Sequence, residues 1–414
     1  MQQKPVSVFS LAVIVAALGY FVDIYDLLLF GIIRISSLKD LGLNDEQIAT
    51  DGLFILNTQM LGLLIGGILW GILGDKKGRL KVLYASIILY SLGNIANGFV
   101  QNVNQYAIIR FITGIGLAGE LGAGITLVSE LLPKEKRGIG TSLVAGIGLT
   151  GAVVAFFLKE YFHWRTCYFI GGGLGFLLLA LRVGVLESGM FKNIQHANIS
   201  KGNFLMFFTN GRRFRKYLLS ILIGLPTWYV IGILVTFSKE FGEKMGVTGT
   251  IDPGKSLMFA YAAISIGDVA VGLLSQYLRS RKKALYIFYG LTIAGIIWFF
   301  NLPPGTPVGV LYAACALLGF GTGFWAIFVT MAAEQFGTNI RATAATTVPN
   351  MVRGSLNLIS AMFVALQPSL GYVKSGWVTG LVAMVIAIGA AILTEESFHK
   401  DLDYVEGDAV PVAP

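Results

Sequence analysis

Long apolar stretches separated by short polar connections run through the whole chain of 414 residues. Each stretch has about 20 residues or more, enough for a helix that rises 1.5 Å per residue to cross a hydrocarbon core of about 30 Å. The pattern predicts an all-α polytopic membrane protein with twelve transmembrane helices. The predicted spans are 8–33, 51–74, 82–100, 105–131, 139–158, 166–187, 217–238, 256–278, 284–302, 307–333, 342–366 and 375–394.

The connections between the predicted spans differ in charge. Four alternate connections hold clusters of Lys and Arg, whereas the opposite set holds only scattered cations such as Lys39 and Lys159. Basic residues concentrate on the cytoplasmic side, and an even number of spans returns the chain to its starting side. We therefore expect both termini in the cytoplasm and a multi-pass protein of the plasma membrane, the inner membrane of a bacterium. The clusters are Lys76, Lys77, Arg79 and Lys81; Lys134, Lys136 and Arg137; Arg212, Arg213, Arg215 and Lys216; and Arg279, Arg281, Lys282 and Lys283.

A repeated charge pattern divides the chain into two related halves. Glu334 and Arg341 repeat the seven-residue spacing of Glu130 and Arg137, and each pair marks the end of the fourth span of a half. Internal repeats whose helices meet near the bilayer midplane are typical of transporters. The predicted organisation is an N-terminal six-helix bundle (1–187), a cytoplasmic linker (188–216), a pseudo-symmetric C-terminal six-helix bundle (217–394) and an acidic cytoplasmic tail (395–414).

The composition narrows the function. Hydrophobic residues make up 55% and charged residues only 13% of the chain, which excludes a soluble enzyme. The net charge of +8 lies in the connections, where it sets orientation, so we expect no nucleic-acid partner. Cys167 and Cys315 fall in predicted spans, and the three histidines lack metal-ligand spacing. We expect no metal and no cofactor, a monomer, and the lipid bilayer, protons and a small solute as partners.

Ionisable residues inside the spans are functional candidates, because an unpaired charge at membrane depth is costly. Asp23 and Asp26 lie three residues apart on the first span, hence on one face. Two close carboxylates in a low dielectric cannot both ionise cheaply, so one is expected to hold a proton. Two alternatives are open. Asp26 and Arg110 form a permanent ion pair that locks two helices, or Asp23 is a helix-end residue exposed to periplasmic water.

Polar residues near the middle of other spans are candidates for a solute site. Glu120 lies about 15 Å along the fourth span from Arg110, near the midplane, and its candidate partner is Arg353. Asn350, Arg353 and Asn357 share a helical face in the eleventh span, where an Arg can bind a carboxylate or phosphate bidentately. Packing of the glycines around Glu120, with Glu120 paired to an Arg, is the alternative. Further candidates for the cavity wall are Gln59, Trp228, Tyr229 and Asp268.

The connection after the second span, GILGDKKGRLK, carries Gly71, Asp75, Gly78 and Arg79 at the positions of the cytoplasmic loop motif of the major facilitator superfamily. The chain resembles this family over essentially its whole length. The stretch GYFVDIYDLLLFG (19–31) and the Trp164–Arg165 pair resemble its sugar-porter and metabolite:proton symporter branch, and the first span also resembles proton-coupled phosphate symporters. Two departures count against sugar and phosphate: the seventh span lacks the paired glutamines of sugar porters and the acid of phosphate symporters.

The resemblance implies two six-helix bundles that rock about a central site. It also implies that the Tyr25–Asp26 pair supplies a protonatable Asp facing Arg110. We interpret Glu130, Arg137, Glu334 and Arg341 as cytoplasmic gate pairs, with static helix capping as the alternative.

The predicted function is a proton-coupled symporter of a small organic anion or carboxylate-bearing metabolite, and not an enzyme. The alternatives are a proton-antiporting exporter of drugs or metabolites, an amino-acid, osmolyte or phosphate symporter, and a non-transporting membrane receptor.

Overall fold

A computed structural model describes residues 10–77, 79–119, 144–186, 204–398, 400 and 406. These residues fold into helices and connecting loops, with no strand beyond an isolated bridge between Thr248 and Pro307. The helices are α1 (Leu11–Asp40), α2 (Asp45–Lys77), α3 (Arg79–Asn97), α4 (Val103–Leu117), α7 (Gly151–Tyr161), α8 (Trp164–Leu186), η1 (Phe204–Phe207), α9 (Gly211–Tyr229), η2 (Val230–Val235), α10 (Ser238–Met245), α11 (Pro253–Tyr277), α12 (Arg281–Phe300), α13 (Val308–Thr322), α14 (Trp325–Glu334), α15 (Thr338–Gly354) and α16 (Leu356–Leu393).

Nine helical stretches within the described residues are long and apolar enough to cross a membrane. The last of them, Asn339–Leu393, covers two predicted spans, and Gly371 breaks its helical geometry with a φ of 73°. Gly tolerates this backbone because it has no Cβ. The predicted span 307–333 is divided into α13 and α14, and the span 105–131 is described only through α4. The count of twelve spans and the side on which the termini lie stay predictions.

Polar side chains fix where several helices begin. Asn102 accepts a hydrogen bond from the Gln105 N–H, and Asp252 accepts one from the Gly254 N–H directly before Pro253. Ser280 does the same for the Lys283 N–H at the start of α12. These caps satisfy N–H groups that have no partner within the helix, and Pro is favoured in the first turn for the same reason. They explain why α4, α11 and α12 begin a few residues before the apolar stretch.

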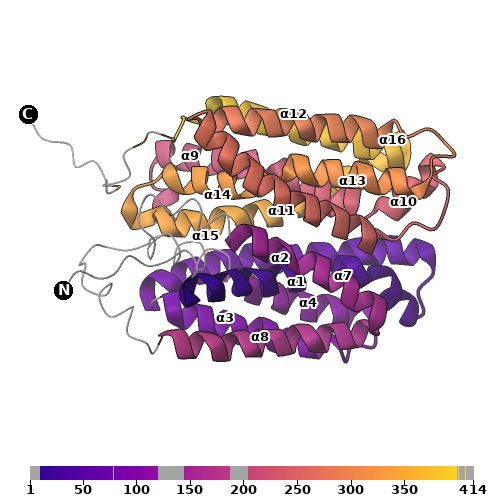
Figure 1. The fold of residues 1–414 in the computed structure, drawn as a ribbon, viewed down its shortest axis with the longest axis horizontal. Coiled ribbons are helices and arrows are strands. Elements are labelled where there is room, and N and C mark those ends of the chain that lie inside the picture. The colour runs from indigo at the N-terminus through magenta and orange to yellow at the C-terminus, as the bar shows by residue number, and fades with distance from the viewer. Residues whose placement is uncertain are drawn as a thin grey trace, which may run out of the picture.

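The chain packs as two layers of helices (Figure 1). Helices α1 to α8, indigo to magenta, form one layer, and α9 to α16, salmon to yellow, form the other. The layers meet most closely where α2 lies against α15: a Cβ added to Gly67 would lie 2.6 Å from the Asn350 Cβ, and one added to Gly354 would lie 2.4 Å from the Leu64 side chain. Small residues permit this close approach between membrane helices. The boundaries predicted for the two bundles stay a prediction.

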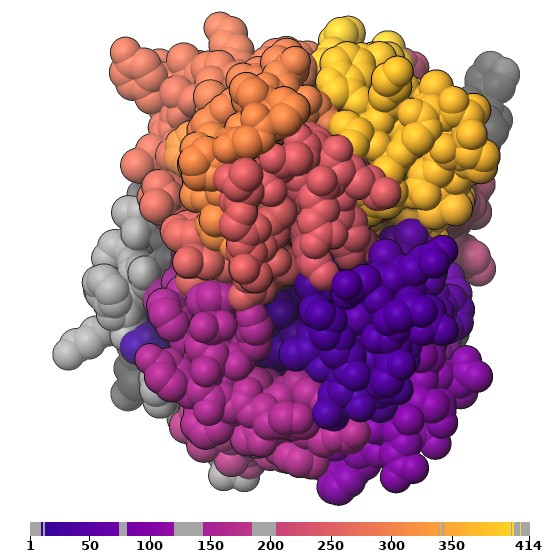
Figure 2. Space-filling model, turned by 90° about the vertical axis from the view of Figure 1, so that its right-hand side faces the viewer, coloured from indigo at the N-terminus to yellow at the C-terminus, as the bar shows by residue number. Residues whose placement is uncertain are grey.

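Ion pairs join the layers at the end of the molecule where α1 ends and α2 begins, which we call the distal end. Arg34 Nη2 of α1 lies 2.7 Å from Glu240 Oε1 of α10, and Lys159, close to the end of α7, pairs with Asp252. A third contact, between Lys239 and Asp45, is more exposed. Figure 2 views this end and shows the two layers in contact across it. The distal end is therefore closed by charged contacts between the halves.

Candidate functional site

A buried ion pair connects the two layers near the middle of the molecule. Arg353 Nη2 of α15 lies 3.6 Å from Asp23 Oδ2 of α1, with exposures of 1% and 0%. Arg353 Nη1 also donates to Asn350 Oδ1 at 3.4 Å, and the Asn350 amide donates to the Ala118 carbonyl at 2.9 Å. Asp23 is therefore not exposed at a helix end. The expected partner of Arg353, Glu120, lies outside the described residues.

Arg110 ties three helices of the first layer together. Its guanidinium donates to the Asp26 main-chain carbonyl (2.9 Å), to Gln59 Oε1 (3.2 Å) and to Asn94 Oδ1 (3.4 Å), and the Gln59 amide donates to the Leu27 carbonyl. The Arg110 and Asp26 side chains form no ion pair in the described residues, so the alternative of a permanent ion pair finds no support there, although Arg110 does lie against Asp26. Gln59, expected in the cavity wall, is fully buried in this network.

The two acids of α1 face different helices. Asp23 meets α15 of the other layer, whereas Asp26 stays within its own layer beside α8. A Cβ added to Gly171 of α8 would lie only 2.6 Å from Asp26 Oδ1. Both carboxyl groups are fully buried. Asp23 is therefore the carboxyl group of α1 that is in direct contact with Arg353.

Asp268 caps a broken helix. Its Oδ1 accepts a hydrogen bond of 2.9 Å from the Ala326 N–H at the start of α14. The break between α13 and α14 lies against α11, because a Cβ added to Gly323 would lie 2.7 Å from the Gly267 Cα. A carboxylate at a helix N-terminus interacts favourably with the helix dipole. The geometry thus gives Asp268 a structural contact and leaves its Oδ2 without a partner among the described residues.

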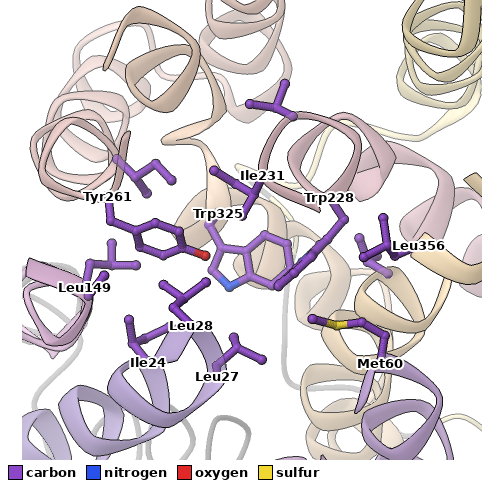
Figure 3. Packing of buried hydrophobic residues seen from close by; sticks show 14 of the residues in the cluster. Ile24, Leu27, Leu28, Met60, Leu149, Trp228, Ile231, Tyr261, Trp325 and Leu356 are labelled. Carbon is purple, nitrogen blue, oxygen red and sulfur yellow. The ribbon is translucent and has the colours of Figure 1, made fainter. Parts of the chain in front are cut away.

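Aromatic side chains from three helices of the second layer converge above α1. Figure 3 shows Trp228, Tyr261 and Trp325 pointing toward one another from α9, α11 and α14, above Ile24 and Leu28 of α1. Trp228 was predicted from the sequence. Tyr261 and Trp325 were missed, although Tyr261 precedes Asp268 by seven residues and so lies on the same helical face.

Three other predicted residues have local structural partners. The Tyr229 hydroxyl donates to the Gly376 carbonyl at 2.7 Å and so faces α16. The Asn357 amide donates to the Gly354 carbonyl at 3.0 Å, across the break between α15 and α16. Gly71 is buried, and a Cβ there would lie 3.1 Å from the Thr347 side chain. These contacts place Tyr229 and Asn357 in the framework of the second layer.

The predicted gate residues are only partly described. Glu334 Oε1 lies 3.3 Å from Arg281 Nη2, and Glu334 Oε2 accepts a hydrogen bond of 2.6 Å from the Ser397 hydroxyl. Arg341 donates to the Phe336 carbonyl. The partner that the structure gives Glu334 is thus Arg281 of α12. Gly78, Glu130 and Arg137, and the side chains of Asp75 and Arg79, lie outside the described residues.

Metal chemistry finds no support in the described part of the chain, where no group of three or more His, Cys, Asp or Glu side chains comes together. The polar centre is instead built from an Arg, carboxyl groups, an amide and aromatic rings. Such a set can exchange protons and bind an anion.

Comparisons with known proteins agree with this architecture. The niacin transporter NiaP of Acinetobacter baylyi is 25% identical to this chain, and the match covers 98% of both. The sialic acid transporter NanX of Escherichia coli is 28% identical over 74% of this chain and 80% of its own. A solved structure, the proton:xylose symporter XylE bound to 6-bromo-6-deoxy-D-glucose, has a TM-score of 0.68, covers 95% of this chain and 97% of its own, and is 16% identical.

The family model that matches the sequence is described as Major Facilitator Superfamily and covers residues 9–360. This match extends from the beginning of the first layer into α16. Together with the apolar helices, it makes the chain a multi-pass integral membrane protein. The chain belongs to the Major Facilitator Superfamily of transporters.

Proposed function

We propose that this protein is a secondary transporter that moves a small organic acid together with a proton across the plasma membrane. The observation that carries this proposal is the buried ion pair between Asp23 and Arg353, which joins the two layers. A buried Arg needs a counter-charge, because an uncompensated ion in a low dielectric is strongly unfavourable. In the absence of solute, Asp23 supplies that counter-charge.

The arrangement suggests how solute and proton are coupled. A carboxylate solute that binds Arg353 replaces Asp23 as its counter-ion, and Asp23 then loses the cation that stabilised its negative charge. A buried carboxyl group that loses a neighbouring cation is shifted toward its protonated form. Solute anion and proton therefore enter together, and the net charge of the centre does not change. Tyr20 and Tyr261 interact electrostatically with both Asp23 and Arg353, Asp26 interacts with Asp23, and Asp268 interacts with Tyr20.

Alternating access supplies the transport step. The ion pairs of the distal end must separate for a solute to reach Arg353 from that side, and the predicted gate of the other end closes in turn. The relatives fit an organic acid, since niacin and sialic acid both carry a carboxyl group. We place the protein in the inner or plasma membrane as a monomer with cytoplasmic termini.

Uptake into proteoliposomes with an inward proton gradient tests the proposal. The wild type should accumulate an organic acid, Arg353→Ala should lose uptake, and Asp23→Asn should lose accumulation driven by the gradient but retain exchange at equal pH. Glu243→Gln, at an exposed position, is the matched control and should behave like the wild type.

Uptake that survives in Arg353→Ala would contradict the assignment of the anion site. Loss of coupling in Asp26→Asn but not in Asp23→Asn would show that Asp26, and not Asp23, carries the coupled proton. Exit of preloaded acid against the same gradient, without uptake, would show an exporter.

A further inference from the structure

Four buried aromatic side chains at the centre keep their polar atoms unused. The hydroxyl groups of Tyr20 and Tyr261 and the indole N–H groups of Trp228 and Trp325 form no hydrogen bond with another described residue, and the Trp228 nitrogen is itself fully buried. These side chains are only 3–7% exposed. Burying a donor without a partner is unfavourable, so an unpaired group in a native protein calls for an explanation.

Four other buried tyrosines do find partners for their hydroxyl groups. The Tyr25 hydroxyl donates to the Cys167 carbonyl at 2.8 Å, the Tyr289 hydroxyl donates to the Ile223 carbonyl at 2.7 Å, and the hydroxyls of Tyr106 and Tyr168 lie 2.7 Å apart. Tertiary packing therefore satisfies phenol groups where the framework requires it. Two of the four unused groups, the hydroxyls of Tyr20 and Tyr261, differ because their side chains interact electrostatically with both Asp23 and Arg353.

Their placement connects them to the anion site. Tyr20 interacts electrostatically with Arg353, Asp23, Asp268 and Tyr261, and Tyr261 interacts with Arg353 and Asp23. Trp325 is the first residue of α14, the helix that Asp268 caps through the next N–H. In Figure 3 the Tyr261 hydroxyl points toward the Trp325 indole, and the Trp228 ring approaches Trp325 from the other side.

Apolar side chains of three further helices also lie around these rings. Ile24, Leu27 and Leu28 of α1, Met60 of α2 and Leu356 of α16 lie around Trp228 and Trp325 in Figure 3. A solute with many hydroxyl groups would lose its hydrogen bonds to water here and find few replacements. A flat apolar ring would instead stack on the indole and phenol faces, which attract aromatic partners.

We propose that this aromatic cluster selects a planar aromatic monocarboxylate, with the carboxylate at Arg353, the ring against Trp228, Tyr261 and Trp325, and a ring acceptor at the Trp228 N–H. The inference rests on the proposed function and narrows its substrate class. It also excludes a sugar acid as the transported solute, whereas the relatives include transporters of both niacin and sialic acid.

Four carboxylates serve as probes in the purified protein and in proteoliposomes. Benzoate has a flat ring, nicotinate adds a ring nitrogen that accepts hydrogen bonds, cyclohexanecarboxylate has a saturated ring of the same size, and N-acetylneuraminate is a sugar acid. Benzoate and nicotinate should bind at least about tenfold more tightly than cyclohexanecarboxylate, and N-acetylneuraminate should not compete.

Two substitutions of one side chain separate the ring from its N–H. Trp228→Phe keeps an aromatic face and removes the N–H donor, so it should weaken the binding of nicotinate about tenfold and leave the binding of benzoate nearly unchanged. Trp228→Leu removes the ring and should weaken both. The melting temperature of each variant without ligand shows whether it folds, and a variant that does not fold is replaced by the same pair of measurements on Trp325→Phe and Trp325→Leu.

Equal binding of cyclohexanecarboxylate and benzoate, or preference for N-acetylneuraminate, would overturn the aromatic inference while leaving a carboxylate transporter in place. Equal losses of nicotinate and benzoate in Trp228→Phe would remove the hydrogen-bonding role of the indole. Failure of all four probes, together with failure of the wider set of acids in the gradient assay, would instead overturn the proposed function.

Discussion

Replacing Glu240 with Gln leaves Arg34 buried at the distal end without its counter-ion. Arg34 is fully buried, and its Nη2 lies 2.7 Å from Glu240 Oε1. At an effective dielectric constant of about 20, two charges at this separation attract by about 6 kcal/mol, and desolvation offsets part of this. Arg34 keeps hydrogen bonds to the Ile48 and Thr236 carbonyls, so we expect a loss of about 3 kcal/mol.

This loss falls on the state in which the distal end is closed. When the layers separate, water reaches both side chains, and the substitution then costs little. A shift of about 3 kcal/mol changes the ratio of open to closed molecules about 100-fold. Glu240→Gln should therefore raise the access of water-soluble reagents to the seam between α1 and α10 by about two orders of magnitude.

Labelling of an introduced cysteine measures this access. The Thr236 side chain lies against Gly31 of α1 and is 3% exposed, so Thr236→Cys reports opening of the seam. The native Cys167 and Cys315 are both buried and give a low background. The rate of reaction with a charged maleimide is compared with and without Glu240→Gln in the same protein.

Two further variants control the measurement. Asp45→Asn removes a distal ion pair in which Asp45 is 70% exposed, and such exposed pairs contribute little to stability, so labelling should change less than about fivefold. Replacing Arg34 and Glu240 together with Met removes both charges and should return the labelling rate toward that of the parent protein. A labelling rate in Glu240→Gln within threefold of the parent would refute the reasoning.

Two other predictions concern stability. A Cβ at Gly62 would lie 2.2 Å from the Phe111 carbonyl oxygen, so Gly62→Ala should lower the free energy of unfolding by about 1–3 kcal/mol. Gly173→Ala is the control, because Gly173 has open space around it, and it should leave the free energy of unfolding unchanged. Thermal melting in detergent compares the two variants. Burial raises the pKa of Glu396, but hydrogen bonds from the Ser280 hydroxyl and the N–H groups that begin α12 outweigh it and hold the pKa below its usual range. This stabilisation is present above the ordinary glutamate pKa and is lost as the pH falls through the lowered value. The difference in melting temperature between the wild type and Glu396→Gln should therefore shrink as the pH is lowered from about 6 to about 3. A difference that stays constant with pH would contradict this prediction.

Helix ends show how far the apolar pattern reaches. The stretch 51–74 predicted the second helix, but α2 begins at Asp45, and α11 begins at Pro253, directly after the Asp252 cap, although the apolar stretch begins at 256. The break between α13 and α14 inside the stretch 307–333 was not predicted. Hydropathy measures the preference of side chains for an apolar environment and carries no information on backbone geometry. The start of α14 therefore becomes visible only in the structure, where the Ala326 N–H donates a hydrogen bond to Asp268.

Partners between helices were harder to predict than the charged residues themselves. Asp23, Asp26, Arg110 and Arg353 were all identified from the sequence, but the partner expected for Arg353 was Glu120, and Asp26 was expected to face Arg110. The structure pairs Asp23 with Arg353 and turns Arg110 to a main-chain carbonyl. Helical periodicity places residues on a face of their own helix, whereas the rotation of each helix against its neighbours depends on packing of the whole bundle.

The sequence by itself determined that the chain is a helical membrane protein, which residues carry charge inside the spans, and the resemblance that the family match confirmed. These properties are local, because apolar length and composition alone decide whether a helix enters a bilayer. The tertiary structure alone decided that Asp23 meets Arg353, that the distal end is closed through Arg34 and Glu240, and that Tyr261 and Trp325 join Trp228 in one aromatic cluster. Those contacts join residues far apart in the chain, and only the close packing of helices brings them together.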